Sequence, residues 1–366
     1  MASILPSAFK LIRVLLLSKF ERMGASSRMR SLQYLPLLES SKLKVVASPL
    51  ICDEMLRNRY KYGRYSLPSL FKAYLGRWIA LMSRGRFDLI WIEKEALPWA
   101  PLWVEMLLLR NVPYVLDYDD AIFHNYDRHR FGWVRKVFGR RLDGLMARAR
   151  LVIGGNEYLA QRARDAGAPW VEVIPSVVDL RRYEIKQDVG EGRVGRIVWI
   201  GSPSTARYLR ELAEPLAALA KSTPFTLHVI GANLEMKGVN LKCLPWSEAT
   251  EAVAIAECDV GIMPLSDSPW ERGKCGYKLV QYMACGLPVV ASPVGANIQL
   301  VHQGVNGWLA NTPEEWVQHL GHLLSDSVAR TRMGQAGRAR VESEYSIQRT
   351  APKIAQLLKA AARNVS

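Results

Sequence analysis

The sequence has few of the features that mark secreted, metal-binding or membrane-spanning proteins. Its 366 residues include only five cysteines, an odd number without C-x-x-C spacing. This argues against a disulfide framework or a zinc site and favours a reducing, cytoplasmic compartment. No apolar run reaches the roughly 20 residues of a transmembrane helix, since Arg13 and Lys19 interrupt the segment 10–20. That segment predicts a buried parallel strand rather than a signal peptide.

Motifs of several ligand-binding classes are also missing. No G-x-G-x-x-G follows the early strands, which argues against an NAD-dependent enzyme. The sequence has no zinc finger, no aromatic RNP-type strand and no clear helix-turn-helix, so we expect no nucleic-acid partner. It also lacks internal repeats and low-complexity tracts.

Positive charge is abundant and unevenly distributed. The net charge is +15, and residues 1–185 hold 30 Lys and Arg against 18 Asp and Glu. A basic first half predicts a polyanionic partner or an anionic membrane surface. The segment 133–141 (WVRKVFGRR) could lie on such a bilayer, giving a peripheral position at the inner face of the cytoplasmic membrane. Alternatively, its apolar residues form the core face of a helix.

Short apolar strands alternate with helix-length segments along the whole chain, which predicts parallel sheets in an α/β fold. The expected strands are 13–18, 44–49, 87–93, 113–119, 150–156, 171–178, 196–202, 225–231, 241–246, 257–265, 287–293 and 307–310. The expected helices include 26–40, 133–149, 205–222 and 351–365.

A polar, glycine-bearing segment divides this alternation into two domains. We predict doubly wound domains at 1–185 and 196–345, a linker at 186–195, and a C-terminal helix at 346–366 that packs back onto the first domain. In such sheets ligands bind outside the carboxyl ends of strands. We therefore expect a site in a cleft between facing domains, with domain closure excluding water.

The stretch 273–295 (GKCGYKLVQYMACGLPVVASPVG) predicts a basic loop, a helix and a buried strand. The first turn of that helix would present N–H groups and a positive dipole to a phosphate, and Lys274 and Lys278 would add charge. Gly276 would allow the backbone to approach the anion closely. A plain loop-helix-strand unit with solvated lysines is the alternative.

The same stretch resembles the donor-binding segment of family-4 glycosyltransferases (glycosyl transferases group 1) of GT-B fold. The similarity continues through 305–309 (VNGWL) and 332–346 (RMGQAGRARVESEYS). The family often carries two glutamates eight positions apart, where this chain has Gly273 and Gln281. The resemblance implies that the donor is a nucleotide diphosphate sugar and assigns donor binding to Lys274, Gly276, Tyr277, Lys278, Leu279 and Gln281. Glu271 could substitute for the missing carboxylate.

A second loop, in 197–209 (IVWIGSPSTARYL), looks like the family's glycine loop after the first strand of the donor domain. Gly201 matches the family's glycine, and Arg207 falls where a lysine usually stands. Ser202 and Thr205 offer hydroxyl groups, although helix capping would explain both equally well.

In the first half, 116–127 (LDYDDAIFHNYD) places three aspartates at the end of an expected strand. Such a cluster of carboxylates predicts that a cation or a hydroxyl-rich ligand binds there, and Mg²⁺ is one candidate. The resemblance instead implies sugar or acceptor binding without a metal, so we assign Asp119, Asp120 and Lys278 as catalytic. The loop after the first strand also resembles a family loop, which implies acceptor-side roles for Gly24, Ser27 and Arg28. Further candidates are Glu93 and Asn156 at strand ends and His124 near the aspartates.

Together these features predict a glycosyltransferase that moves a sugar from a nucleotide diphosphate sugar to a hydroxyl of a glycan or lipid-linked acceptor. The resemblance implies retention of configuration, no cofactor, and a place in surface polysaccharide, lipopolysaccharide or glycolipid assembly. A nucleotide-sugar 2-epimerase of GT-B type would need no acceptor. A non-catalytic nucleotide-sugar or polyanion-binding protein is the third possibility, because Gln281 and Gly273 replace acidic residues.

Overall fold

The computed structural model describes residues 11–185 and 194–363, and these form two compact units. Unit 1 comprises Met1–Gly155, Leu159–Ile174 and Thr350–Ser366, and unit 2 comprises Asn156–Tyr158 and Pro175–Arg349. Most of the expected linker, residues 186–193, lies outside the described residues, while Gly195 already begins a strand of unit 2. Within the described ranges no helix has the length and apolar character needed to cross a membrane.

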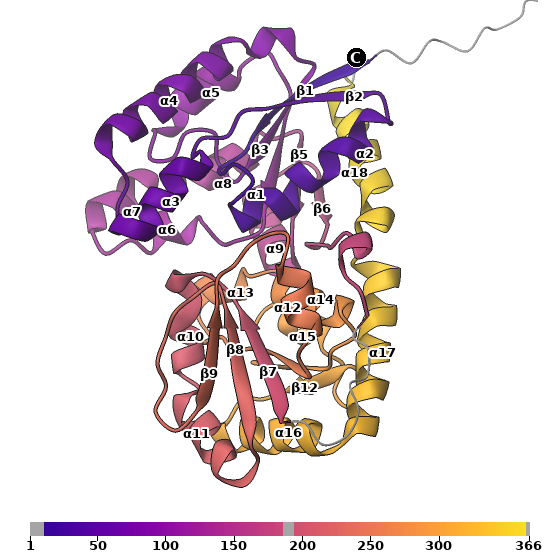
Figure 1. Cartoon of the computed structure of the whole chain (residues 1–366). Helices are drawn as coiled ribbons and strands as arrows, with labels where there is room; N and C mark the ends of the chain where they lie inside the picture. Colours follow the sequence, from indigo (N-terminus) through magenta and orange to yellow (C-terminus); the bar gives the residue numbers. More distant parts are fainter. Residues whose placement is uncertain (1–10, 186–193, 364–366) are drawn as a thin grey trace, which may run out of the picture. The chain divides into compact units, whose positions relative to one another are not determined.

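Unit 1 contains a six-stranded parallel sheet with the strand order β2-β1-β3-β4-β5-β6 (Figure 1). Its strands are β1 (Ile12–Leu17), β2 (Leu43–Ala47), β3 (Leu89–Glu93), β4 (Tyr114–Tyr118), β5 (Leu151–Gly154) and β6 (Val171–Val173). The chain moves from β1 to β2 and then returns to the other side of β1 to form β3. The switch point at which ligands bind in such sheets therefore lies between β1 and β3.

Ten helices accompany this sheet. They are α1 (Ala25–Arg30), α2 (Leu35–Glu39), α3 (Asp53–Tyr62), α4 (Leu67–Met82), α5 (Leu102–Leu109), α6 (His124–Asp127), α7 (Gly132–Phe138), α8 (Arg141–Met146), α9 (Glu157–Asp165) and α18 (Ile347–Ala362). In unit 1, α18 is held by a hydrogen bond between Thr350 and Tyr34 and by an ion pair between Lys353 and Glu172.

Unit 2 has a second six-stranded parallel sheet, in the order β12-β11-β10-β7-β8-β9. Its strands are β7 (Gly195–Ile200), β8 (Phe225–Ile230), β9 (Asn240–Leu244), β10 (Val260–Met263), β11 (Val289–Ala291) and β12 (Gly307–Leu309). Its helices are α10 (Ala206–Arg210), α11 (Ala213–Ser222), α12 (Glu251–Ala256), α13 (Pro269–Arg272), α14 (Tyr277–Ala284), α15 (Asn297–Leu300), α16 (Pro313–Ser325) and α17 (Ser327–Glu344). Here the strand order reverses between β7 and β10, which places the switch point there.

Both faces of the unit 2 sheet are packed. Successive residues of a strand point to opposite faces, so Val198 and Ile200 join one hydrophobic cluster while Ile197 and Trp199 join the other. Helix α14 belongs to the first cluster and α16 to the second. The expected α/β fold with two doubly wound sheets is confirmed.

Three expected helices are interrupted. The segment 26–40 divides into α1 and α2. The segment 205–222 divides into α10 and α11, and a short 3-10 turn at Pro203–Thr205 precedes α10. Prolines explain both breaks, because Pro36 and Pro215 lack an N–H and clash with the carbonyl four residues earlier. The segment 133–149 divides at Gly139, where a side chain would collide with the carbonyl of Arg135.

Candidate active site

Polar side chains gather at the switch point of unit 1. Ser26 and Ser27 follow β1, Glu93 ends β3 and Asp119 follows β4. The Ser27 hydroxyl donates to Glu93 at 2.5 Å, and the Ser26 hydroxyl lies 2.9 Å from the same carboxylate. Ser26 also lies 2.5 Å from a carboxylate oxygen of Asp119. The predicted residues Ser27, Glu93 and Asp119 thus belong to one cluster, and Glu93 holds the loop after β1 in place.

A lysine that the sequence did not reveal lies at the centre of this cluster. Lys94 Nζ is 2.9 Å from Asp119, 3.5 Å from Asp120 and 2.8 Å from the Ser26 hydroxyl. Its backbone has a φ of 67°, a left-handed conformation that is costly for a residue other than glycine. The cation that pairs with Asp119 and Asp120 is therefore the buried Lys94 side chain.

The charges of this cluster support each other. Burial raises the pKa of Asp119, but the Lys94 ammonium and the Ser26 hydroxyl outweigh burial and hold it below its ordinary value. Burial lowers the pKa of Lys94, and the carboxylates of Asp119, Asp120 and Glu93 more than reverse this. Asp120 is the more accessible aspartate, with 29% of its side chain exposed against 13% for Asp119. An ionised carboxylate in that position can accept hydrogen bonds from hydroxyl groups.

The third aspartate does not belong to this site. Asp117 lies within β4, is buried, and accepts two hydrogen bonds from Arg30 at 2.7 and 2.8 Å. Arg30 also donates to the carbonyl of Ile174. The expectation of three aspartates facing one ligand is therefore wrong for Asp117, because its buried carboxylate is paired with Arg30.

The other predicted residues of unit 1 have structural partners. Gly24 precedes α1, and a side chain there would collide with Phe20. Arg28 is buried and donates to the carbonyl of Arg22. His124 Nδ1 lies 2.8 Å from Asp127, and burial lowers the pKa of His124.

In unit 2, Lys278 lies in the first turn of α14, close to the switch point. Its Nζ is 4.6 Å from the centroid of the Trp199 ring, at the end of β7. Burial, aided by the like charge of Lys274, lowers the pKa of Lys278 from 10.5 to about 7. Among the described residues no ion pair joins Lys278 to a carboxylate, so its charge is uncompensated until an anion arrives.

The turn that leads into α14 requires glycine. Gly276 has a φ of 66°, and a side chain there would collide with Leu300. Leu279 lies in the hydrophobic core with no exposed surface, so its side chain packs the helix against the sheet and is not available to a ligand. Tyr277 and Gln281 both contact the Tyr183 hydroxyl, at 3.4 and 2.9 Å. The Gln281 amide is thus a structural hydrogen-bond donor.

The loop after β7 is tightly closed. A side chain at Gly201 would collide with the Trp199 ring. The Thr205 hydroxyl accepts from the Ser202 amide at 3.1 Å and donates to the Ser202 carbonyl at 3.0 Å. Ser202 and Thr205 therefore fix the turn by local capping.

Arg207 and Glu271 form a second charged group on unit 2. Arg207 is 62% exposed, and its guanidinium lies 3.2 Å from Glu271 and 2.7 Å from the Tyr208 hydroxyl. Glu271 also accepts from the hydroxyls of Tyr208 and Ser268. Burial raises the pKa of Glu271, but these hydrogen bonds outweigh it and hold the pKa below its ordinary value. Glu271 is thus an ionised carboxylate near the expected position of the family's glutamate.

Asn156 groups with unit 2 rather than with the acceptor-side residues of unit 1. Its amide donates to the carbonyls of Arg272 and Lys274, at 3.3 and 3.0 Å. Asn156 therefore supports the basic loop before α14.

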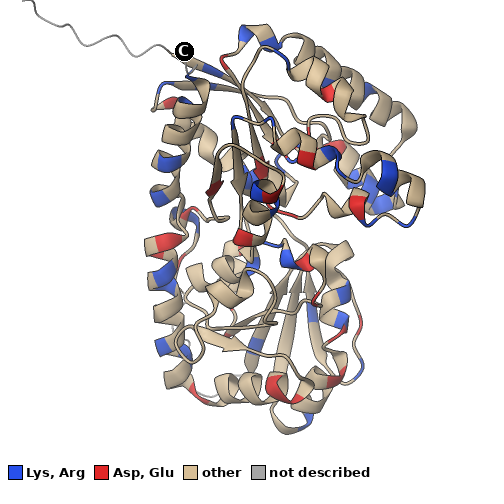
Figure 2. Ribbon diagram, turned by 180° about the vertical axis from the view of Figure 1, so that it is seen from behind, with Lys and Arg blue, Asp and Glu red and all other residues tan. Residues whose placement is uncertain are grey.

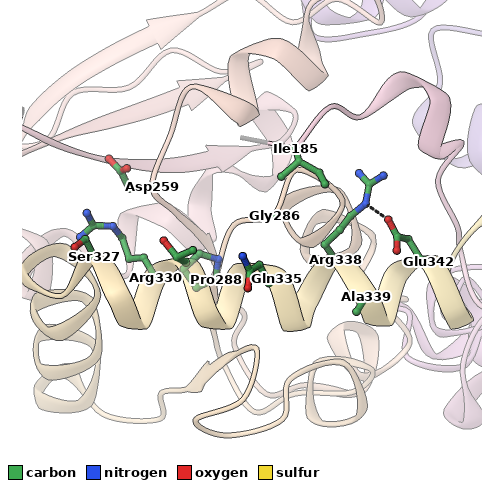
Figure 3. Close-up of a pocket in the computed structure, with 11 residues that line it drawn as sticks. Ile185, Asp259, Gly286, Pro288, Ser327, Arg330, Gln335, Arg338, Ala339 and Glu342 are labelled. Atoms are coloured by element: carbon green, nitrogen blue, oxygen red, sulfur yellow. Dashed lines mark hydrogen bonds and ion pairs between the residues drawn. The ribbon is translucent and has the colours of Figure 1, made fainter. Parts of the chain in front are cut away.

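A pocket of about 300 Å³ lies at the opposite edge of the unit 2 sheet (Figure 3). It is lined by Asp259 and Pro288, which precede β10 and β11, and by the α17 side chains of Arg330 and Arg338. Arg330 donates to the carbonyls of Leu323 and Leu324, and Arg338 pairs with Glu342 at 2.7 Å. Because these arginines serve the fold and the pocket lies at the amino ends of strands, it is not the candidate site.

Two important residues lacked a usable sequence signal. Trp199 is one of eleven tryptophans and stands in an ordinary strand pattern. Lys94 is one charged residue in the run EKE, and only the parallel pairing of β3 with β4 brings it to the aspartates.

Comparison with known proteins agrees with the geometry of unit 2. Residues 194–326 match the family described as Glycosyl transferases group 1. Unit 2 carries a group 1 glycosyl transferase domain. For residues 194–326, this match agrees with the expected family and with the expected enzyme class, a glycosyltransferase. The spore coat protein SA of Bacillus subtilis (strain 168) is 33% identical over 75 residues, and this match spans only 20% of either chain.

Solved structures of glycosyltransferases share the fold along nearly the whole chain. HepE of Anabaena, in complex with UDP and glucose, has a TM-score of 0.71 at 17% identity and covers 95% of this chain and 100% of its own. Sucrose-phosphate synthase of Thermosynechococcus elongatus has a TM-score of 0.72 at 16% identity and covers 95% of this chain and 98% of its own. The GT-B fold expected from the sequence is confirmed.

Proposed function

We propose that this chain transfers a sugar from a nucleotide diphosphate sugar to an acceptor hydroxyl, with retention of configuration. The observation that carries the proposal is Lys278, a partly buried lysine that pairs with no carboxylate of residues 11–185 or 194–363, located at the switch point of a group 1 glycosyl transferase domain. The complexes of HepE with UDP and with UDP-glucose support a donor of this class.

The donor diphosphate would be held by Lys278 and by the basic loop that includes Lys274. As the bond between the sugar and the diphosphate breaks, negative charge develops on the leaving phosphate. The Lys278 ammonium and the positive end of α14 stabilise that charge, and no protein metal ion is required in this scheme. Glu271, fixed by Tyr208 and Ser268, would accept hydrogen bonds from donor hydroxyls, with Arg207 beside it.

The acceptor hydroxyl would be bound by Asp119 and Asp120 in unit 1. Lys94 pairs with both carboxylates and holds the pKa of Asp119 below its ordinary value, so that Asp119 accepts hydrogen bonds and does not donate them. A glycan or a lipid-linked glycan, with many hydroxyl groups, suits such a site. This places the proposed reaction in the assembly of a surface polysaccharide or glycolipid.

A lipid-linked acceptor fits the expected membrane contact of 133–141. Trp133 and Val137 are exposed on α7, whereas Val134 is buried. Of the four apolar residues in this segment, one is therefore buried, Phe138 is partly buried, and Trp133 and Val137 remain available to a lipid surface.

A thermal-shift panel of UDP-, GDP-, ADP- and dTDP-sugars tests the donor proposal. We expect one donor to raise the melting temperature, since a ligand at 100 times its Kd adds about 2.7 kcal/mol to the free energy of unfolding. The shift should vanish in Lys278→Ala and persist in Lys221→Ala, which removes an exposed lysine of α11. A shift that persists in Lys278→Ala would contradict the assignment.

Incubating the matched donor without acceptor distinguishes the alternatives. A transferase leaves the sugar configuration of the donor unchanged, whereas an epimerase converts the donor itself. A protein that binds the donor but neither transfers nor epimerises the sugar would be the non-catalytic alternative.

A further inference from the structure

Helix α4 exposes an apolar stripe where a surface helix normally carries polar residues. Six large apolar side chains of this helix are between 43% and 79% exposed, and their spacing of three or four residues places them on one face. They are Leu67, Phe71, Leu75, Trp78, Ile79 and Met82. Figure 1 shows α4 beside α5, on which Trp103 and Leu107 are also exposed.

The opposite face of α4 fixes this orientation. Arg77 is buried and donates to the carbonyls of Ser18, Ser48 and Ala96, which follow β1, β2 and β3. Leu81 is also buried on this side. Rotating α4 to hide its apolar stripe would break the hydrogen bonds that Arg77 donates to these three carbonyls. The stripe is therefore a fixed feature of the surface.

The chain before, within and after α4 is strongly basic. From Met55 to Phe87 it contains eight Lys and Arg, of which only Arg77 is buried, and no Asp or Glu. The Lys and Arg positions are blue in Figure 2. Apolar side chains bordered by Lys and Arg are the composition that binds an anionic bilayer in its interfacial plane.

We propose that α4 lies in the interface of an anionic lipid bilayer, with its exposed stripe inserted among the acyl chains. The helix has 16 residues and is about 24 Å long, shorter than the roughly 30 Å hydrocarbon core, so it lies along the surface and does not cross. A second copy of this chain is a poorer occupant. A two-fold symmetric interface would set this basic face against itself, and the like charges would repel.

The surface differs from the 133–141 segment and does not depend on sugar transfer. Vesicle binding needs no nucleotide sugar, and donor binding by thermal shift needs no vesicle. Failure of one proposal therefore leaves the other testable.

Vesicle flotation of the full chain tests this proposal, with phosphatidylcholine vesicles compared with vesicles that also contain phosphatidylglycerol. We expect binding to the anionic vesicles only, weakening as salt is raised. The variant Phe71→Gln/Trp78→Gln/Ile79→Gln should lower the binding constant at least about tenfold. As a matched control, Val253→Gln/Val328→Gln removes exposed apolar side chains from α12 and α17 of unit 2 and should bind as the wild type does.

Three results would overturn the proposal. One is the absence of wild-type binding to anionic vesicles at low salt. Another is undiminished binding of the triple variant, which would place the lipid contact elsewhere. The third is a wild-type dimer in sedimentation velocity that the triple variant abolishes while neither binds vesicles, which would assign the stripe to a second copy. Circular dichroism and the donor-induced thermal shift report whether the triple variant is folded.

Discussion

The affinity of this chain for its nucleotide diphosphate sugar is expected to fall about tenfold between pH 6 and pH 8. The reason is the pKa of Lys278, which burial lowers to about 7. Below that pH the free protein already carries the ammonium that meets the diphosphate. Above it, Lys278 must first take up a proton, and binding weakens by the corresponding free energy.

The sign of this effect follows from the two states of Lys278. In the free protein a lowered pKa means that the neutral amine predominates above about pH 7. A bound diphosphate favours the ammonium and raises the pKa again. Binding at pH 8 should therefore take up about one proton. A diphosphate diester has no ionisation of its own in this range, so the donor sugar is a better probe than the free nucleotide.

Isothermal titration in two buffers with different ionisation enthalpies measures this proton uptake. Lys278→Arg keeps a positive charge throughout the range and should bind without the pH dependence. Lys278→Ala should lose the pH dependence together with about a hundredfold or more of kcat/KM, the usual effect of removing one stabilising group from a leaving anion. Wild-type affinity that is constant from pH 6 to pH 8, with no proton uptake, would refute the assignment of Lys278.

The donor half of the site was more predictable than the acceptor half, for a physical reason. Lys274, Gly276 and Lys278 lie within one loop and the first turn of one helix, so their spacing in the sequence determines their spacing in space. The cluster of unit 1 instead joins Ser26, Lys94 and Asp119 from loops after three different strands. The order of strands in the sheet, which local periodicity does not encode, brings these residues together.

The sequence motif also suggested that some side chains are free to bind the donor although they are engaged in the fold. Leu279 and Gln281 match the donor motif, yet one lies in the core and the other binds Tyr183. A helix that carries a ligand site must also pack against its sheet, and residues of both kinds alternate along it. The sequence predicted the helix and its first turn correctly, but the direction of each side chain required the fold.

Replacing Lys94 by methionine is expected to lower the free energy of unfolding of unit 1 by about 3–5 kcal/mol, the usual cost of leaving buried charges without their partner. Lys94 is nearly buried and lies within 3.5 Å of both Asp119 and Asp120. Urea unfolding followed by circular dichroism measures the loss. Lys44→Met, which removes an exposed lysine of β2, should change stability by less than about 0.5 kcal/mol.

Acidification distinguishes this electrostatic account from lost packing. Lys94 holds the pKa of Asp119 below its ordinary value, so in the wild type this carboxylate contributes stability above its unfolded pKa and loses it as the pH falls through the folded pKa. Without Lys94, burial dominates and raises the pKa of Asp119. Protonation of Asp119 at mildly acidic pH then removes the unpaired buried charge that destabilises the variant. The stability difference between wild type and Lys94→Met should therefore narrow from pH 8 to pH 5, and Asp119→Asn in the Lys94→Met background should recover part of the loss. A difference that stays constant with pH would mean that Lys94 stabilises unit 1 by packing alone, and the ionised state of the acceptor-side aspartates would need another explanation.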